Sequence, residues 1–404
     1  MKVMVVHNRY RSAAPSGENR VVDQESRLLE NAGHQVAHFE RESDEIDDWS
    51  VWQKASLPAR VVWNPATRTA LGEALRGFRP DVVHVHNTFP LLSPSVLTAC
   101  RTARVPVVAT LHNYKTLCAS GDFYRAGQVC HRCANGSPVA ALVHRCYRNS
   151  VAATTPVVVS GMVNRSAWRR LVSAYIFISA SQRQLLTELR APRERCFVKA
   201  NFVPRMDTVP AVAKQPMVLY AGRLDEAKGV PLLLAAWDRY RAAAGDGGLR
   251  LCIVGGGPLA GDVERWAVGR RDVDVVGLTD RAECLRLLAQ ARAAILPSQW
   301  EETFGLVAVE AMAVRTPPVA PAHGSFPELI TPGVDGALYR PGDPADLARV
   351  LADIDTHPDR YAGYGANAAA TYERRFRPED NAEELVRILR FAIEHPVFRS
   401  RGGR

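Results

Sequence analysis

The sequence predicts an α/β protein made of two Rossmann-like domains, and three observations support this fold class. A chain of 404 residues with 47% hydrophobic residues is long enough to bury two cores, each in a domain of about 150 to 200 residues. Two successive series of short apolar runs alternate with segments of helical periodicity, which is typical of parallel sheets. A segment with three prolines, Phe202 to Pro216, separates the two series.

The first series opens with a strand, a polar loop and a helix. Lys2 to His7 is a buried-type strand, Asn8 to Asn19 is a polar loop that contains a glycine, and Arg20 to Ala32 carries apolar residues at helical spacing. This succession is the opening of a Rossmann-like unit. Further strands are expected at Asp81 to His86, Val105 to Thr110 and Ile176 to Ser179.

The second series repeats the alternation of strands and helices after the proline-rich linker. Its expected strands are Met217 to Ala221, Leu251 to Val254, Val273 to Val276, Ala293 to Pro297 and Pro318 to Ala320. Ligands of such parallel sheets bind at the carboxyl ends of the strands, so the loops there are candidates for a site. A final helix is expected at about Pro378 to Glu394, followed by a disordered tail from Ser400 to Arg404.

The apolar runs and the net charge restrict the cellular context. Met1 to His7 is too short an apolar run for a signal peptide, and no run of about 18 apolar residues offers a membrane span. We therefore expect a cytoplasmic protein. The net charge of +9 favours anionic partners such as sugar diphosphates, lipid headgroups or nucleic acid, and charge alone does not choose among them.

Two carboxylates flank a predicted helix start between Gln299 and Ala313. Glu302 precedes a Phe-Gly-Leu step and Glu310 lies in the apolar run that follows it. A helix N-terminus offers backbone N–H groups and the positive end of its dipole to a diphosphate. Carboxylates on either side would accept hydrogen bonds from sugar and ribose hydroxyls. Helix capping is the alternative explanation for either Glu taken singly.

Four motifs in one order along the chain carry a resemblance to a known family. They are Gly222-Arg223-Leu224 with Lys228-Gly229, Val254-Gly255-Gly256-Gly257-Pro258, the E-x7-E pair Glu302 and Glu310, and Gly324-Ser325-Phe326-Pro327-Glu328. Together they resemble the large family of retaining glycosyltransferases with two Rossmann-like domains, the group 1 (glycosyltransferase family 4) type of GT-B fold. The similarity runs along essentially the whole chain.

The resemblance implies a domain organisation. It places an acceptor-side domain at residues 1–203, with a cysteine-rich insertion at 113–150, and a domain that binds the nucleotide sugar at 216–377. The two domains would face a cleft. Residues 378–404 would form a helix that crosses back to the N-terminal domain, and a tail.

The resemblance also assigns roles on the second domain. Arg223 and Lys228 would neutralise the diphosphate and stabilise the leaving nucleotide, which is electrostatic catalysis by preorganised positive charge. Glu310 would bind the ribose hydroxyls and Glu302 the donor sugar. The remaining donor contacts would be Gly222, Gly256, Leu278, Phe304, Gly305 and Leu306, with Leu278 in the loop where relatives contact the base.

On the first domain the resemblance points to a glycine and a histidine. Gly17 stands where relatives use a glycine loop to approach the phosphate and the acceptor, although many relatives have two glycines there. His112 follows the strand that ends at Leu111 and matches the family's histidine that contacts the donor sugar. A structural hydrogen-bonding role is the alternative. We assign His84 and His86 to the edge of the cleft and not to a metal.

Neither domain shows a nucleophile with an adjacent base. In the family, retention is usually explained by same-face displacement, in which the leaving phosphate helps to deprotonate the acceptor hydroxyl. This chemistry would need no catalytic metal. Two Asp-x-Asp strings, Asp272 to Asp274 and Asp353 to Asp355, do not follow the phosphate motifs, so we do not assign manganese to them.

Half of the eight cysteines lie close together in the sequence. Cys118, Cys130, Cys133 and Cys146 fall within 29 residues and have a Cys-x2-Cys at their centre, a spacing that suits one tetrahedral zinc. A reducing compartment favours zinc over disulfides. The sequence therefore predicts a structural zinc in the insertion. Four ordinary thiols in a long loop are the alternative.

A basic stretch with one aromatic residue, Arg165 to Val172, suggests contact with anionic lipid. A solvated helix face is the alternative. Relatives often glycosylate lipid-linked or polysaccharide acceptors at the membrane, which favours a peripheral position on its inner face.

The most consistent function is transfer of a hexose from a UDP-, GDP- or dTDP-sugar to a glycan or lipid-linked acceptor, in cell-envelope, polysaccharide or glycoconjugate biosynthesis. A nucleotide-sugar epimerase of similar fold is the closest enzyme alternative. A non-catalytic, basic, zinc-containing binding protein is the alternative of another class. Binding of nucleic acid is not expected, because the basic residues are dispersed and such a role leaves Glu302 and Lys228 without a function.

Overall fold

The computed structural model describes residues 1–12, 16–206, 212–245 and 247–398 of the chain. It forms two compact units, which we call unit 1 and unit 2. Unit 1 holds Met1–Phe123, His131–Asn201 and the segment from Glu379 onward, and unit 2 holds Tyr124–Cys130 and Phe202–Pro378. Residues 207–211 of the predicted linker and the predicted tail from Ser400 lie outside the described residues.

The core of unit 1 is a parallel sheet of six strands in the order β2-β1-β3-β4-β7-β8. Its central strands are almost entirely buried, as expected where helices cover both faces of a sheet. The bounds are Lys2–Arg9 for β1, Gln35–Glu42 for β2, Val82–Asn87 for β3, Val107–Leu111 for β4, Ala174–Phe177 for β7 and Cys196–Val198 for β8.

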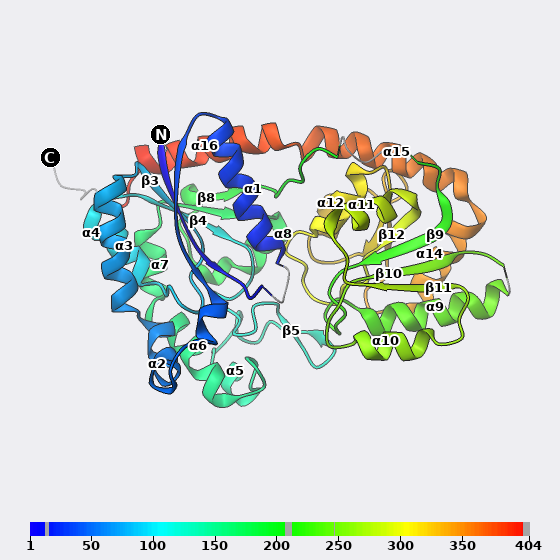
Figure 1. Ribbon diagram of the computed structural model, residues 1–404, viewed down its shortest axis with the longest axis horizontal. Helices are drawn as coiled ribbons and strands as arrows, with labels where there is room; N and C mark the ends of the chain where they lie inside the picture. The colour runs from blue at the N-terminus through cyan, green and yellow to red at the C-terminus, as the bar shows by residue number, and fades with distance from the viewer. Residues whose placement is uncertain (13–15, 207–211, 246, 399–404) are drawn as a thin grey trace. The chain divides into compact units, whose positions relative to one another are not determined.

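Two sets of helices cover the faces of this sheet (Figure 1). On one face lie α1 (Gly17–Asn31) and α16 (Pro378–Glu394), whose apolar residues pack together with those of β1 and β7. On the other lie α3 (Pro65–Phe78) and α4 (Ser95–Ala103). The C-terminal helix is therefore part of the core of unit 1.

The remaining helices of unit 1 lie beside this layered core. They are α2 (Val51–Val62), α5 (Ala140–Val143), α6 (Val151–Val163), α7 (Arg165–Leu171) and α8 (Ala180–Leu185). α6 packs against both α2 and α5. A short antiparallel hairpin of β5 (Tyr124–Arg125) and β6 (Gln128–Val129) belongs to unit 2 by its contacts.

Unit 2 contains a second parallel sheet of six strands, in the order β11-β10-β9-β12-β13-β14. Its strands are β9 (Gln215–Ala221), β10 (Arg250–Val254), β11 (Val273–Gly277), β12 (Ala291–Ile295), β13 (Pro318–Pro321) and β14 (Ala337–Tyr339). Its helices are α9 (Val230–Ala244), α10 (Ala260–Ala267), α11 (Arg281–Gln290), α12 (Leu306–Ala313), α13 (Phe326–Leu329), α14 (Pro344–Thr356) and α15 (Pro358–Arg375). α9, α10 and α14 pack on one face, and α11 and α12 on the other.

The predicted fold class, α/β with two Rossmann-like parallel sheets, is confirmed. Within the described ranges, none of the helices is both long and apolar enough to cross a membrane.

Candidate active site

In unit 2, two glycine turns meet at the carboxyl ends of β9 and β10. The amide of Gly222 donates to the carbonyl of Val254 (3.0 Å), and the amide of Leu224 donates to the carbonyl of Gly256 (2.9 Å). Because the turns are in backbone contact, a Cβ on Gly255 would lie 1.9 Å from the Gly222 oxygen. The predicted phosphate loop is thus held by backbone contacts that leave no room for a side chain.

Lys228 is held next to Glu302 at the end of this loop. Its Nζ lies 2.8 Å from Glu302 Oε2 and 4.8 Å from the centre of the Trp300 ring. The same carboxylate oxygen accepts from Trp300 Nε1 (2.9 Å) and Ser298 Oγ (3.1 Å). Glu302 is buried, so these donors stabilise its charge. The structure therefore brings together two of the predicted catalytic residues.

The predicted helix start between the two carboxylates is confirmed. α12 begins at Leu306, with Gly305 at its N-cap in the left-handed region (φ +88°). A Cβ on Gly305 would lie 2.9 Å from the ring of Phe326, so only glycine fits. Phe304 is buried, which leaves its backbone as the part able to approach a ligand. Backbone amides at a helix N-terminus are suited to a phosphate.

Glu310 lies inside α12 and forms an ion pair with Arg281, the first residue of α11, at 3.1 Å. Its side chain is buried. Arg223, in contrast, is 64% exposed and pairs with Asp225. Leu278 is exposed and lies next to Gly256: a Cβ added to Gly256 would be 2.9 Å from the Cγ of Leu278. The residues predicted for the donor thus cluster around the ends of β9 and β10 and the start of α12.

In unit 1, Gly17 is the first residue of α1, and Ser16 caps this helix by accepting from the amide of Glu18 (3.2 Å). The adjacent Glu18 was not predicted as a site residue. Its carboxylate is buried, accepts from Tyr10 Oη (3.1 Å) and lies near Asn113 Nδ2 (3.4 Å). Burial raises the pKa of Glu18 to about 8. In the sequence, only the position of Glu18 directly after the glycine loop indicates that it belongs to the site.

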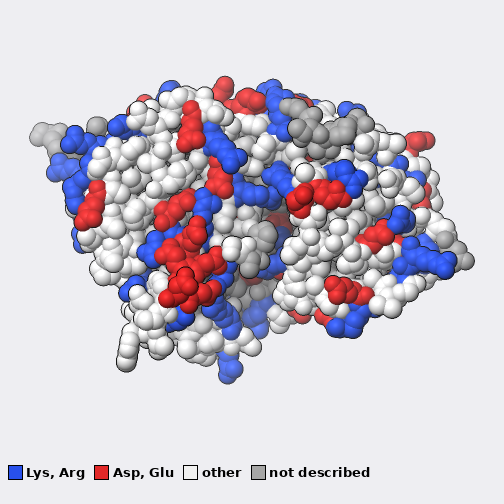
Figure 2. Space-filling model, in the orientation of Figure 1, with Lys and Arg blue, Asp and Glu red and all other residues white. Residues whose placement is uncertain are grey.

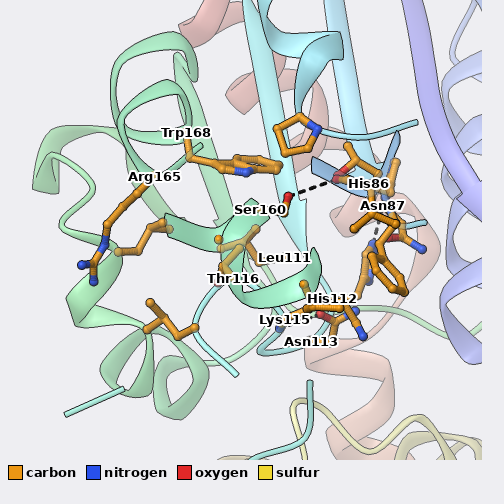
Figure 3. Close-up of a pocket in the computed structure, with 18 residues that line it drawn as sticks. His86, Asn87, Leu111, His112, Asn113, Lys115, Thr116, Ser160, Arg165 and Trp168 are labelled. Atoms are coloured by element: carbon orange, nitrogen blue, oxygen red, sulfur yellow. Dashed lines mark hydrogen bonds between the residues drawn. The ribbon is translucent and has the colours of Figure 1, made fainter. Parts of the chain in front are cut away.

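His112 directly follows β4 and lines a cavity of about 850 Å³ with Asn113, Lys115, His86 and Trp168 (Figure 3). His112 Nε2 lies 2.9 Å from His86 Nδ1, so one of these two nitrogens carries the shared proton. Burial, together with nearby cationic groups, holds the pKa of His112 well below its usual value. His112 is therefore neutral at neutral pH and suited to hydrogen bonding.

A buried ion pair lies close to His112. Lys199 Nζ is 2.7 Å from Glu25 Oε1 and 2.8 Å from Asn381 Oδ1. In the described ranges, the one group of three or more potential metal ligands with atoms within 4.8 Å of one another is Glu25, His84 and His86. Because Lys199 already neutralises Glu25, we describe this group as an ion pair beside two histidines. His86 lines the cavity, but His84 is fully buried and not at an edge as predicted.

The predicted zinc site in the insertion stays a prediction. The cysteines Cys118, Cys130, Cys133 and Cys146 are absent from the only such group of ligands found in the described ranges. Cys118 packs in the main core of unit 1, and Cys133 and Cys146 pack in a smaller apolar cluster around α5 and α6. These thiols fill apolar space in the insertion, which is a common role of cysteine.

For the basic stretch that begins at Arg165, the predicted contact with anionic lipid stays a prediction. The stretch forms the helix α7, in which Arg169 and Arg170 are exposed. Trp168, the aromatic residue of this stretch, is partly buried and lines the cavity of His112.

Two family profiles together cover most of the chain. The profile described as Glycosyltransferase Family 4 matches residues 15–205, and the one described as Glycosyl transferases group 1 matches residues 206–371. Among individual proteins, the glycogen synthase of Mycobacterium tuberculosis is 28% identical over 399 residues, 89% of this chain and 87% of that protein. The D-inositol 3-phosphate glycosyltransferase of Mycolicibacterium smegmatis is 34% identical over 167 residues, 39% of this chain and 37% of that protein.

Solved structures show the same fold. The Anabaena protein HepE in complex with UDP has a TM-score of 0.65 at 20% identity, covering 96% of this chain and 100% of that one. Sucrose-phosphate synthase from Thermosynechococcus elongatus has a TM-score of 0.68 at 19% identity, covering 96% of this chain and 98% of that one. At this identity the likeness establishes the GT-B fold and not the substrates. With both family profiles matched in order, the chain belongs to the group 1 (family 4) glycosyltransferases and is a transferase of GT-B fold.

Proposed function

We propose that this glycosyltransferase moves a sugar, with retention of configuration, from a nucleoside-diphosphate sugar to a hydroxyl of a glycan or lipid-linked acceptor. One observation carries the proposal: the ammonium of Lys228 lies 2.8 Å from the buried Glu302 carboxylate, close in sequence to the N-terminus of α12. A cation, a carboxylate and the backbone amides of a helix N-terminus suit a diphosphate next to a sugar hydroxyl. The HepE complexes with UDP and with UDP-glucose favour a UDP-sugar as the first donor to test.

In this proposal the residues of unit 2 hold the donor. Lys228 and Arg223 neutralise the diphosphate and stabilise the negative charge that develops on the leaving nucleotide. Arg223 is largely exposed and can turn towards a phosphate. Glu310 accepts from the ribose hydroxyls in place of its contact with Arg281, and Glu302 accepts from a hydroxyl of the sugar.

The residues of unit 1 serve the sugar and the acceptor. The neutral His112 hydrogen-bonds the donor sugar, and the amide of Gly17 approaches the phosphate. The acceptor hydroxyl attacks the anomeric carbon from the side that the phosphate leaves, and the departing phosphate oxygen takes the hydroxyl proton. Retention follows without a covalent enzyme intermediate.

We further propose that the chemistry uses no divalent metal, because Lys228 and Arg223 supply the positive charge that a metal would otherwise provide. The reaction would take place at the inner face of a membrane, in the biosynthesis of envelope polysaccharide or another glycoconjugate.

The proposal is tested by donor hydrolysis. Purified protein is incubated with UDP-, GDP- and dTDP-sugars, with and without EDTA, and nucleoside diphosphate release and sugar identity are followed by mass spectrometry. One of these donors should be hydrolysed slowly, at the same rate with and without EDTA. Glu302→Ala and Lys228→Ala should each lower the rate by about 100- to 1,000-fold, which is typical for loss of one preorganised electrostatic contact.

Glu283→Ala and Arg265→Ala are matched controls, because both side chains lie in exposed ion pairs on helices of unit 2. Their rates should equal that of the unchanged protein. A donor sugar that is epimerised in the absence of acceptor, or hydrolysis that requires added manganese, would overturn the proposed reaction.

A further inference from the structure

Two stretches of the chain, which belong to unit 1 except for Tyr124–Cys130, are free of acidic residues. Asp and Glu make up 42 of the 404 residues, about one in ten, yet neither occurs between residues 49 and 72 or between residues 123 and 187. These two stretches contain the whole of α2, α5, α6 and α7. Their basic residues are Lys54, Arg60, Arg68, Arg125, Arg132, Arg145, Arg148, Arg165, Arg169, Arg170 and Arg183. Such a one-sided charge favours an anionic partner.

The same helices expose large apolar side chains. Trp52 on α2 is 86% exposed, Val143 at the end of α5 is 72% exposed, and Met162 on α6 is 56% exposed. Val51, Val151, Val159 and Val163 are exposed on α2 and α6 as well. The sequence of α6 is apolar on almost every side, although the helix is not buried. A helix of that kind normally contacts protein or lipid.

α2, α5 and α6 form one continuous surface, which we call the α2/α5/α6 face. α6 is tied to α2 by hydrogen bonds from Ser160 Oγ to the carbonyl of Val61 (3.1 Å) and from Asn164 Nδ2 to that of Val62 (2.9 Å). In Figure 1 the three helices lie together at the lower edge of unit 1. Figure 2 shows Lys and Arg together with uncharged residues along this edge, while the acidic residues on that side lie higher.

A cavity opens beside this face. It is open to solvent, and its space of about 520 Å³ includes part of that solvent. Residues of α6 and of the cysteine-rich insertion line it, among them Val158, Ala141 and Met162. Met162 is both part of its wall and exposed on the α2/α5/α6 face. The cavity shares Thr116, Val157 and other residues with the larger cavity that contains His112. The two cavities therefore adjoin along a common wall.

Two cations, Lys115 and Arg165, belong to this common wall. Lys115 Nζ is buried between the rings of Phe89 (4.3 Å) and Tyr147 (4.8 Å). Burial lowers its pKa to about 8, because the charged form is poorly solvated. Arg165 donates to the carbonyl of Glu188 (2.9 Å). A desolvated ammonium of this kind is stabilised by an anion, and a phosphate suits both side chains.

From these observations we propose that the acceptor is a phosphate-containing lipid, taken from an anionic bilayer on which the α2/α5/α6 face rests. The phosphate binds Lys115 and Arg165, the apolar chain lies in the smaller cavity, and the acceptor hydroxyl reaches the larger cavity beside His112. This inference rests on the proposed function and specifies the acceptor and the surface that meets the membrane.

The docking surface is tested with vesicles, independently of any catalysis. Binding is measured by flotation with phosphatidylcholine vesicles and with vesicles of phosphatidylcholine and phosphatidylglycerol. The protein should bind the anionic vesicles at least about tenfold more tightly. The double variant Trp52→Ser, Val143→Ser should bind the anionic vesicles about tenfold more weakly. Val268 of unit 2 is 79% exposed, and Val268→Ser should leave the affinity for these vesicles unchanged. Equal binding by the double variant, or no vesicle binding at all, would overturn the docking surface.

The cavity is tested by calorimetric titration with octyl phosphate, inorganic phosphate and octanol. Octyl phosphate should bind at least about tenfold more tightly than either of the others. Gly161→Leu should remove this advantage, because the leucine would project from the common wall. The substitution should be tolerated in the fold, since the only atom near a Cβ there is the carbonyl of Thr116 at 3.9 Å. An unchanged melting temperature would verify this.

Equal affinity for the three compounds, or full retention of the octyl phosphate advantage in Gly161→Leu, would overturn the cavity assignment. The proposed function is judged separately by donor hydrolysis. Hydrolysis without octyl phosphate binding would refute the lipid acceptor alone, and octyl phosphate binding without hydrolysis of any donor would refute the proposed reaction alone.

Discussion

Individual buried side chains of unit 1 carry much of its candidate chemistry. Glu18, His112 and Lys115 all have pKa values displaced by burial, towards the neutral form in each case. Of these, only His112 was predicted from the sequence, because it ends a strand and matches a family motif. Burial depends on the tertiary fold, so the sequence gives no sign of it at Glu18 and Lys115.

Glu18 should make the stability of unit 1 depend on pH. Its pKa is about 8 in the folded chain and near its ordinary value of about 4.3 when unfolded. Between these values the folded state holds a proton that the unfolded state has released, so stability is fully present below the lower value and is lost as pH rises towards 8. The loss is at most about 1.4 kcal/mol per pH unit.

The measurement is the free energy of unfolding of the protein and of Glu18→Gln from pH 5 to 9. Subtracting the variant cancels the contributions of titrating groups that are distant from Glu18. The stability of the unchanged protein relative to the variant should fall up to about pH 8 and then level off. A difference that does not vary with pH would show that Glu18 is ionised in the folded chain.

At the scale of single elements, α12 is the part of the site that the sequence predicted best. The apolar run, the preceding Phe-Gly-Leu step and the two carboxylates all have their expected positions around Gly305. For the insertion, cysteine spacing alone does not reveal whether the thiols converge on a metal or pack separately, so its zinc site stays a prediction. The strands β8 and β14 were missed since each has only three residues, too few for a periodic pattern.

Substitution of Gly305 should disturb both the fold and the proposed donor site. Gly305→Ala places a Cβ in the left-handed region and 2.9 Å from Phe326, which is buried. We expect a loss of roughly 1 to 3 kcal/mol in the free energy of unfolding, and weaker binding of UDP because the amides at the start of α12 move. Denaturant unfolding and calorimetry measure the two effects.

Gly333→Ala is the matched control for that substitution. Gly333 has a similar φ of +79°, but the nearest atom to an added Cβ is the Tyr364 oxygen at 3.9 Å. Gly333→Ala should lose stability through backbone strain alone, and it should bind UDP as tightly as the unchanged protein does. Equal stability losses in the two variants would show that the contact with Phe326 contributes nothing.

At the scale of the whole molecule, the sequence predicted two parallel sheets because apolar runs and helical periodicity alternate twice. The return of the last helix to unit 1 followed only from the family resemblance. Leu385, Ile388, Leu389 and Ala392 mark an apolar face at helical spacing, yet such spacing does not say which sheet the face covers. In the structure these residues pack against β1 and β7, far away in the sequence.

α16 should therefore contribute to the stability of unit 1. Leu389→Ala removes a fully buried side chain and should lower the free energy of unfolding of unit 1 by about 2 to 5 kcal/mol. The neighbouring Arg390 is exposed, so Arg390→Ala should have little effect. Hydrogen exchange of β1 and β7 amides reports on unit 1 specifically. Unchanged exchange in Leu389→Ala would mean that α16 is dispensable for this sheet.

The central claim is that Lys228 and the start of α12 hold the diphosphate of a nucleotide sugar. The most direct test is calorimetric titration of UDP into the unchanged protein and into Lys228→Met. We predict binding that is weakened by at least about tenfold in the variant, with Arg265→Met unchanged, because one desolvated charge-assisted contact contributes roughly 1.5 to 3 kcal/mol. Equal affinity of Lys228→Met and the unchanged protein for UDP, GDP and dTDP would contradict the account.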